Sequence, residues 1–349
     1  MSKLGLAMIG CGQIARIHLR ESIDDPRLRW VAAVDVRPEA AEALADEFGI
    51  PGRYRTVDEL LADPAVDAVV VATSPTAHLE PTVQAFAAGK HVLVEKPVAI
   101  GAAEVEAMVA AQGDLVGACC SCRFRATSSA ARAAAYLASG MLGRIRRLRA
   151  EVFLPGPEDF DGTQPFFLHR EQWGGQGILA DWSCYDFDYL FGLCNWSLTP
   201  ELVLAETSGL PAPYRRVAAP RNDVEVAASA QVHLSDGAWL LYRRAAFHPG
   251  PPRAEWAIEA EEGTLDLCML PGTPQVVVHR NGPRGGSETL VETADSWSAV
   301  HGGPIRDFVG AISEGRQPLT PLRRALVAQR LTDAIYQSAG TGEAVRLTS

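Results

Sequence analysis

The sequence predicts an α/β protein with two domains, and three observations lead to this fold class. Short apolar runs alternate with helical segments over residues 4–122, which is typical of a parallel sheet with helices on both faces. From Val224 to Leu234 every second residue is apolar, the pattern of a sheet with one buried face. The chain has 349 residues, and a single core rarely grows beyond about 250 residues.

The first expected strand covers residues 4–9, and the glycine-rich turn Gly10-Cys11-Gly12-Gln13-Ile14-Ala15 follows it directly. The two glycines allow a tight turn and a close approach of the backbone to a pyrophosphate group, and Ala15 takes the place of a third glycine. A helix over residues 13–23 would point its N-terminal amides at the phosphates. We therefore expect a dinucleotide site whose pyrophosphate is held by Gly10, Gly12, Gln13 and Ile14.

A second expected strand, residues 30–34, ends at Asp35, 20 residues after Ala15. An acidic side chain at this position reaches the ribose hydroxyls of the adenosine. Asp35 would repel a 2′-phosphate, which favours NAD over NADP. Arg37 keeps NADP open as the alternative, because its guanidinium could bind that phosphate or stack on the adenine.

Two further strands, residues 68–72 and 92–94, each end in a loop at the expected ligand-binding edge of the sheet. After the first of them we expect cofactor contacts from Thr73, Ser74, Pro75 and His78, although His78 fits a structural histidine equally well. After the second come Glu95, Lys96 and Pro97. Pro97 ends the strand, and a partly desolvated Lys96 is suited to carry a proton, with an ordinary surface lysine as the alternative. A strand over residues 115–122 completes the alternation, and Arg123 follows it.

On these residues the chain resembles the Gfo/Idh/MocA family (glucose–fructose oxidoreductase, inositol dehydrogenase, rhizopine catabolism). The matching segments are residues 10–15, 72–78 and 88–97, with 88–97 the most specific, and the likeness continues through 123–124, 140–145, 306–309, 314–316 and 334–339. The resemblance implies a Rossmann dinucleotide-binding domain at residues 1–124. It also implies a substrate-binding and oligomerisation domain at residues 125–349 with a large, mostly antiparallel sheet. Glu95, Lys96 and Arg123 are expected beside the cofactor.

The second domain carries two catalytic candidates, Asp181 and Tyr185, after the glycine-rich segment 174–177. The family usually shows Asp, three residues and then His, so Tyr185 stands where the resemblance implies His. Residues at i and i+4 share a helix face, and Asp188 lies on that face too. The alternative is a helix face buried in a core, since Trp182 and Phe187 fit a core.

Two assignments of the proton transfer are open. Either Lys96 carries the proton and Tyr185 orients the substrate, or Tyr185 carries it and Lys96 lowers the tyrosine pKa. Both require that Lys96 and Tyr185 meet beside the nicotinamide, with Asp181 orienting the substrate hydroxyl. The family resemblance also implies that the segment before the glycines approaches the nicotinamide and the substrate, which makes His169, Arg170 and Trp173 further candidates. An ordinary polar loop is the alternative for His169 and Arg170, and core packing is the alternative for Trp173.

Composition limits the possible partners. The formal net charge is −10, which argues against a nucleic-acid or anionic-membrane surface. No apolar run reaches the 18 or so residues of a bilayer span, and no signal core follows Lys3, so we expect a cytoplasmic protein. The seven cysteines lack regular spacing, and we expect no metal site, with Cys119, Cys120 and Cys122 as small buried hydrophobes.

The resulting expectation is an NAD(H)-dependent oxidoreductase that acts on a secondary hydroxyl or ketone of a sugar or cyclitol, and that forms a homo-oligomer through its second-domain sheet. Two alternatives stay open. One is cleavage of a glycoside by oxidation and elimination without net NAD turnover. The other is a protein that binds NAD or sugar without catalysis.

Overall fold

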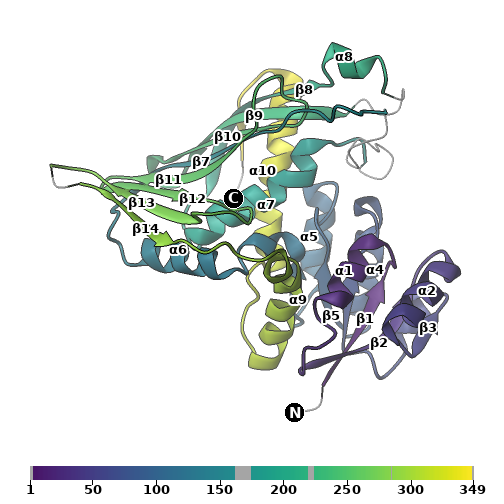
Figure 1. The fold of residues 1–349 in the computed structure, drawn as a ribbon. Helices are drawn as coiled ribbons and strands as arrows, with labels where there is room; N and C mark the ends of the chain where they lie inside the picture. The colour runs from purple at the N-terminus through teal and green to yellow at the C-terminus, as the bar shows by residue number, and fades with distance from the viewer. Residues whose placement is uncertain (1–2, 162–173, 219–223, 284, 348–349) are drawn as a thin grey trace. The chain divides into compact units, whose positions relative to one another are not determined.

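The computed structural model describes residues 3–161, 174–218, 224–283 and 285–347 (Figure 1). The chain forms two compact units, Met1–Ala126 with Trp297–Leu326, and Thr127–Ser296 with Val327–Ser349. The segment Trp297–Leu326 therefore packs with the first unit, although it lies within the predicted second domain. The domain division at residues 124 and 125 stays a prediction.

The first unit contains a six-stranded parallel sheet in the order β3-β2-β1-β4-β5-β6. Its strands are β1 (Leu4–Ile9), β2 (Leu28–Val34), β3 (Gly52–Tyr54), β4 (Ala68–Val71), β5 (His91–Val94) and β6 (Gly117–Cys119). Val69, Val70 and Val71 are fully buried, as a strand covered on both faces requires. The strand order reverses between β1 and β4, and ligands of such sheets bind at this point, beyond the carboxyl ends of the strands.

Helices cover both faces of this sheet. Leu19, Leu44 and Phe308 belong to the core on one face, and Leu60, Phe86 and Met108 belong to the core on the other. The helices are α1 (Gln13–Arg20), α2 (Pro38–Phe48), α3 (Val57–Leu61), α4 (Leu79–Ala87), α5 (Ala102–Ala111) and α9 (Trp297–Glu314), with the 3-10 turns η1 (Pro75–Ala77) and η2 (Cys120–Phe124).

The strand expected over residues 115–122 is shorter in the structure. It ends at Cys119, whose sulfur accepts a hydrogen bond from the Ser121 amide and so caps the turn η2. Cys119, Cys120 and Cys122 are buried, in agreement with their expected role as small hydrophobes.

The second unit contains a nine-stranded sheet in the order β14-β13-β12-β11-β7-β10-β9-β8-β15. All neighbouring strands are antiparallel except β7 and β10, which confirms the predicted fold class. The strands are β7 (Ile145–Phe153), β8 (Pro200–Gly209), β9 (Glu225–Leu234), β10 (Trp239–Ala245), β11 (Arg253–Ala260), β12 (Gly263–Leu267), β13 (Val276–Arg280), β14 (Ser287–Val291) and β15 (Val345–Arg346). The other elements are α6 (Ser128–Ala138), α7 (Ile178–Leu193), α8 (Ala212–Arg215), η4 (Ser235–Gly237) and α10 (Leu322–Thr341).

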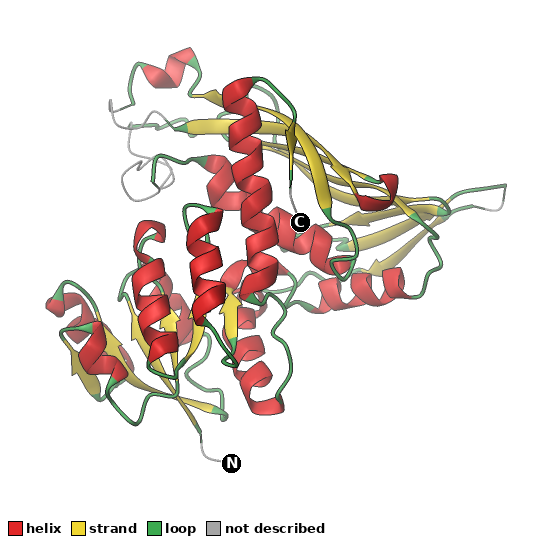
Figure 2. Ribbon diagram, turned by 180° about the vertical axis from the view of Figure 1, so that it is seen from behind, coloured by secondary structure: helices red, strands yellow, loops and turns green. Residues whose placement is uncertain are grey.

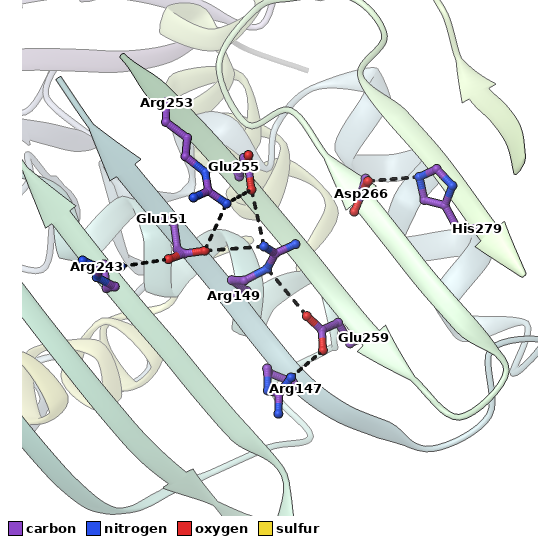
Figure 3. A network of polar contacts seen from close by, with 9 residues as sticks. All are labelled: Arg147, Arg149, Glu151, Arg243, Arg253, Glu255, Glu259, Asp266 and His279. Atoms are coloured by element: carbon purple, nitrogen blue, oxygen red, sulfur yellow. Dashed lines mark hydrogen bonds and ion pairs between the residues drawn. The ribbon is translucent and has the colours of Figure 1, made fainter. Parts of the chain in front are cut away.

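The two faces of this second sheet differ. Helices α6, α7 and α10 lie against one face, where Val226, Val232 and Leu234 of β9 are buried (Figure 2). The opposite face carries a network of ion pairs (Figure 3). In it the Arg149 guanidinium lies 3.4 Å from the carboxylates of Glu151 and Glu255 and 3.6 Å from that of Glu259. The alternation read from the sequence therefore separates an apolar, helix-covered face from a charged one.

Among the helices that the structure describes, none combines the length and the apolar character that a bilayer crossing needs.

Candidate active site

The glycine turn after β1 has the form that a bound pyrophosphate needs. Gly10 has a φ of +92°, and a Cβ atom there would lie 2.7 Å from the carbonyl oxygen of Ala72, so only glycine fits. At Gly12 a Cβ would meet no atom within 4 Å, which leaves open space over the first turn of α1. Gly12 supplies no side-chain cap to α1, and this first turn carries no acidic residue. The backbone amides of Gln13 and Ile14 thus lie at the positive end of a helix, where anionic groups bind.

Asp35 follows β2 beside this turn. Its Oδ2 accepts a hydrogen bond from the Cys11 amide at 2.8 Å, and its Oδ1 accepts one from the Arg37 amide at 2.9 Å. Each carboxylate oxygen has a second lone pair, so both can still accept a ribose hydroxyl. Burial and the Asp35 charge raise the pKa of the Cys11 thiol to about 12, which keeps the thiol neutral. The Arg37 side chain is 66% exposed, with its Nε 3.7 Å from Asp35 Oδ1.

His78 is fully buried between the loop after β4 and the loop after β5. Its Nδ1 lies 3.0 Å from the carbonyl oxygen of Pro97 and 3.3 Å from that of Val98, and its Nε2 lies 3.1 Å from that of Thr73. Burial lowers the pKa of His78 below its ordinary value. Because both ring nitrogens face backbone carbonyls, the geometry favours the structural interpretation of this residue over direct cofactor contact.

Thr73, Ser74 and Pro75 form the rest of that loop. The Thr73 hydroxyl donates a hydrogen bond to the carbonyl oxygen of Ala77 at 3.0 Å, which closes the 3-10 turn η1. Ser74 is exposed and Pro75 is buried. Their contact with a cofactor stays a prediction.

Glu95 anchors the segment that carries Lys96. Its carboxylate is nearly fully buried, and Oε2 accepts a hydrogen bond from the backbone amide of Lys96 at 2.8 Å. Oε1 lies 2.6 Å from Nε2 of His18 on α1, and it accepts a hydrogen bond from the Arg123 guanidinium at 2.8 Å. Burial alone would raise the pKa of Glu95, but the Arg123 charge and the His18 hydrogen bond outweigh it and hold this pKa well below its usual range. Glu95 therefore stays ionised.

His18, Glu95 and Cys120 lie close enough to be considered as metal ligands, since their ligand atoms are within 4.8 Å of one another. Two features argue for a charge network instead. The Arg123 guanidinium already donates to the carboxylate that the ion would need. Burial also raises the pKa of the Cys120 thiol well above its ordinary value, so the thiolate ligand is disfavoured.

His18 is not among the site residues that the sequence predicts. The helical spacing of the sequence nevertheless indicates that His18 is buried, because it lies three residues after Ala15 and one before Leu19, on the buried face of α1. A histidine on such a face needs a polar partner, and that partner is Glu95.

In the second unit, α7 carries Asp181 in its first turn and Tyr185 one turn later. Tyr185 is 3% exposed, and its ring lies edge-on to that of Trp182, with 5.6 Å between centroids. Asp188 is fully buried. The structure thus confirms that these residues lie on one helix, while their roles, and the meeting of Tyr185 with Lys96, stay predictions.

Two residues of the sheet hold α7, and neither is among the site residues that the sequence predicts. Glu225 of β9 accepts hydrogen bonds from the amides of Gly177 and Leu179 at 3.0 and 3.1 Å, and so caps the helix. Arg244 of β10 forms a buried pair with Asp186, with nitrogen–oxygen distances of 2.8 and 2.9 Å. Its guanidinium also lies 4.4 Å from the centre of the Trp182 ring.

The remaining candidates, His169, Arg170 and Trp173, lie outside the described residues.

Comparison with known proteins matches both halves of the chain to one family. Residues 4–115 match an oxidoreductase family with an NAD-binding Rossmann fold, Gfo/Idh/MocA, and residues 130–266 match the C-terminal domain of the same family. The chain belongs to the Gfo/Idh/MocA family of oxidoreductases. The resemblance drawn from the sequence is therefore confirmed, whereas the replacement of a family histidine by Tyr185 remains an inference.

Several members of the Gfo/Idh/MocA family are similar over the whole chain. A 1,5-anhydro-D-fructose reductase from Ensifer adhaerens is 33% identical over 353 aligned positions, which cover 99% of each chain. The crystal structure of GenD2 from gentamicin A biosynthesis in complex with NAD is 25% identical with a TM-score of 0.79, covering 100% of this chain and 97% of that one. An aldose-aldose oxidoreductase from Caulobacter crescentus, complexed with glycerol, is also 25% identical with a TM-score of 0.79, covering 99% and 100%.

Proposed function

We propose that this protein is an NAD(H)-dependent oxidoreductase that interconverts a secondary hydroxyl group and a ketone on a sugar, a sugar derivative or a cyclitol. One observation carries the proposal. Lys96 is the second residue after β5, at the same carboxyl edge of the sheet as Gly10, after β1, and Asp35, after β2. This edge supplies an anion-binding helix start, a carboxylate for ribose and a lysine for proton transfer. The matched relatives are named reductases, dehydrogenases and oxidoreductases, several of them of sugars or inositol.

The residues of the glycine turn and Asp35, the residue after β2, fit the cofactor that the family implies. Gly10 and Gly12 leave room for the pyrophosphate, the amides of Gln13 and Ile14 hold it, and Asp35 accepts the ribose hydroxyls. When bound, the nicotinamide accepts or donates the hydride. The negative charge of Asp35 favours NAD, because it would lie against the 2′-phosphate of NADP.

The protein's own residues handle the proton. We assign Lys96 and Tyr185 to proton transfer, with either of them as the carrier, and Asp181 to orienting the substrate hydroxyl. An unperturbed tyrosine has a pKa of about 10, so it needs a nearby cation to act as a base near neutral pH. A lysine ammonium satisfies that requirement.

Copies of the chain associate, in this proposal, through the charged face of the second sheet. Leu204 and Trp239 are 53% and 40% exposed. Trp239 of β10 is paired in register with Arg147 of the network in Figure 3, and Leu204 of β8 is aligned with Arg149 through Gln231 and Leu241 of the strands between them. A face that combines apolar side chains with both signs of charge can complement a second copy of itself. We also propose a cytoplasmic location, since the seven cysteines are all free thiols, as a reducing compartment favours.

A panel of sugars, cyclitols and glycosides with NAD and with NADP, followed by the absorbance of the reduced nicotinamide, tests the proposed function. Turnover of at least one sugar or cyclitol, with NAD preferred, supports it. Glycoside cleavage with retained cofactor and no net reduction would support oxidation and elimination instead. Ligand binding with no absorbance change across the panel would instead indicate a protein that binds NAD or sugar without catalysis.

A further inference from the structure

The backbone on both sides of Lys96 is held by a fully buried histidine. On the N-terminal side, His18 of α1 contacts the carboxylate of Glu95. On the C-terminal side, His78 contacts the carbonyl groups of Pro97 and Val98. The two histidines come from different segments, one after β1 and one after β4, and both belong to the first unit.

The His18 side works through a single carboxylate. Glu95 Oε1 lies 2.6 Å from His18 Nε2, and Glu95 Oε2 accepts the Lys96 amide hydrogen at 2.8 Å. Since a carboxylate is planar, fixing one oxygen on α1 also fixes the other oxygen, and with it the amide of Lys96. The Arg123 guanidinium donates to the same Oε1 at 2.8 Å and balances the buried charge.

The second nitrogen of His18 shows why this contact matters. Among the described residues, the buried Nδ1 of His18 has no hydrogen-bond partner. An unpartnered buried polar atom is unfavourable, and an apolar side chain of similar size would avoid it. The close polar contact of the His18 ring is therefore the one between Nε2 and Glu95. The Cys120 sulfur lies farther from Nε2, at 3.9 Å.

The His78 side acts directly on the backbone. Its Nδ1 lies 3.0 Å from the carbonyl oxygen of Pro97, the residue after Lys96, and its Nε2 lies 3.1 Å from that of Thr73. A neutral ring has a single N–H, so one of its nitrogens donates a hydrogen bond while the other only contacts its carbonyl, and the ring packs between two loops at the carboxyl edge of the sheet. With both neighbours of Lys96 held, the course of the backbone at this residue is fixed.

We propose that His18 and His78 are positioning residues that hold the backbone of Lys96 from its two sides and so set the position of the ammonium group. The inference rests on the proposed function for its effect on catalysis. A misplacement of about 1 Å at a reacting group can cost about a hundredfold in rate. Neither histidine is assigned to proton transfer, because the His18 ring contacts Glu95 and the His78 ring contacts backbone carbonyls.

Hydrogen exchange tests the proposal without any substrate. The full-length wild type is compared with His18→Leu, His18→Gln and His78→Leu, and exchange is followed in peptides that cover residues 91–98. We expect faster exchange of the Lys96 amide in His18→Leu. In His18→Gln the side-chain N–H can replace Nε2, so we expect exchange close to wild type. His91→Leu is the matched control, because His91 accepts the Val116 amide at 2.9 Å at the far end of β5.

Kinetics with the best substrate of the panel give the second readout. For His18→Leu and His78→Leu we expect kcat to fall by about ten- to a hundredfold, with the Kd for NADH changed less than about twofold. His18→Gln is expected to recover most of kcat, and His91→Leu to keep it while melting at a lower temperature. Unchanged exchange at Lys96 in folded His18→Leu, or a Gln variant no better than the Leu variant, would overturn the positioning role. If the wild type turned over no substrate of the panel, the proposed function would be overturned instead. The hydrogen-exchange result would then decide by itself whether the two histidines hold the backbone of Lys96.

Discussion

The hydroxyl of Tyr336 lies 2.8 Å from the carboxylate of Glu225, and together they close the first turn of α7. The N-cap residue of this helix is Gly177, which has no side chain to offer, so the cap comes from β9 and α10 instead. A carboxylate at a helix N-terminus complements the helix dipole. The helix that carries Asp181 and Tyr185 is thus fixed at its start by a residue of the sheet.

We predict that this cap makes stability depend on pH in an unusual direction. Burial raises the pKa of Glu225, although its hydrogen bonds from Tyr336, Leu179 and Gly177 oppose the shift. A carboxyl whose pKa is raised by folding contributes its full stability below the unfolded value of about 4.3, and loses it as pH rises through the folded value. Glu225→Gln should therefore become more stable relative to wild type as pH rises from about 4 to 8.

Urea unfolding of wild type and Glu225→Gln at several pH values measures this difference. Glu206→Gln is a matched control, because Glu206 is exposed on the neighbouring strand β8. If the free energy of unfolding of Glu225→Gln fell relative to that of wild type as pH rises, the raised pKa of Glu225 would be contradicted.

The buried pair of Arg244 and Asp186 leads to a second prediction. Asp186 is fully buried and also accepts a hydrogen bond from Trp256 Nε1 at 2.9 Å. Removing one partner of a buried pair leaves the other charge uncompensated, so Arg244→Met should lower the free energy of unfolding by about 3–5 kcal/mol. Arg244→Lys should recover little, because an ammonium cannot donate two parallel hydrogen bonds to the carboxylate.

The double variant Asp186→Leu with Arg244→Met tests whether the loss is electrostatic. We expect it to be more stable than Arg244→Met alone, since no charge is then left unpaired. Denaturant unfolding gives the free energies of unfolding of wild type, Arg244→Met, Arg244→Lys and the double variant. A loss below about 1 kcal/mol in Arg244→Met would show that water reaches Asp186.

Local patterns predicted the first unit well, and distant pairings account for what they missed. The glycine turn, the apolar runs and Asp35 are read from neighbouring residues, so β1, β2, β4 and β5 were expected near their observed places. By contrast, His18 and Glu95 are 77 residues apart, and Asp186 and Arg244 are 58 apart. Such partners depend on strand order and register, which a single sequence does not specify. The packing of α9 on the first unit is missed for the same reason.

The same limit applies to the candidate site. The types and local spacing of Lys96, Asp181 and Tyr185 suit proton transfer, so the sequence alone predicts these three residues. In the sequence Glu225 is one polar residue of an alternating strand, and nothing near it in the chain shows that its carboxylate caps α7. Polar residues at alternating positions of a strand therefore need to be tested against helix starts elsewhere in the chain.

Cofactor preference gives a third prediction. Asp35→Asn removes the negative charge and keeps one oxygen as an acceptor for the Cys11 or Arg37 amide. With the repulsion lost and Arg37 still present, the ratio of kcat/KM for NAD to that for NADP should fall by about tenfold or more, equivalent to about 1.4 kcal/mol. Asp46→Asn, an exposed position on α2, is the control. An unchanged ratio would remove Asp35 from the cofactor site.

Tyr185 gives a fourth prediction. Tyr185→Phe keeps the edge-on contact with Trp182 and removes only the hydroxyl. If that hydroxyl carries or directs the proton, kcat should fall by at least about tenfold, within the range of acid–base contributions. Tyr189→Phe, in the next turn of α7 and also buried, is the matched control and should keep kcat. A rate close to wild type in Tyr185→Phe would make this tyrosine a core residue.

Lys96 gives the fifth prediction. Lys96→Ala should abolish turnover while leaving the affinity for NAD nearly intact, because the pyrophosphate and ribose contacts are assigned to Gly10, Gly12 and Asp35. Lys96→Arg separates the two functions of the ammonium: guanidinium keeps the positive charge but does not release a proton near neutral pH. Activity in Lys96→Arg, measured across pH, would indicate that the charge suffices and that Tyr185 carries the proton. Loss in both variants assigns the proton to Lys96, whereas full activity in Lys96→Ala would remove it from the mechanism.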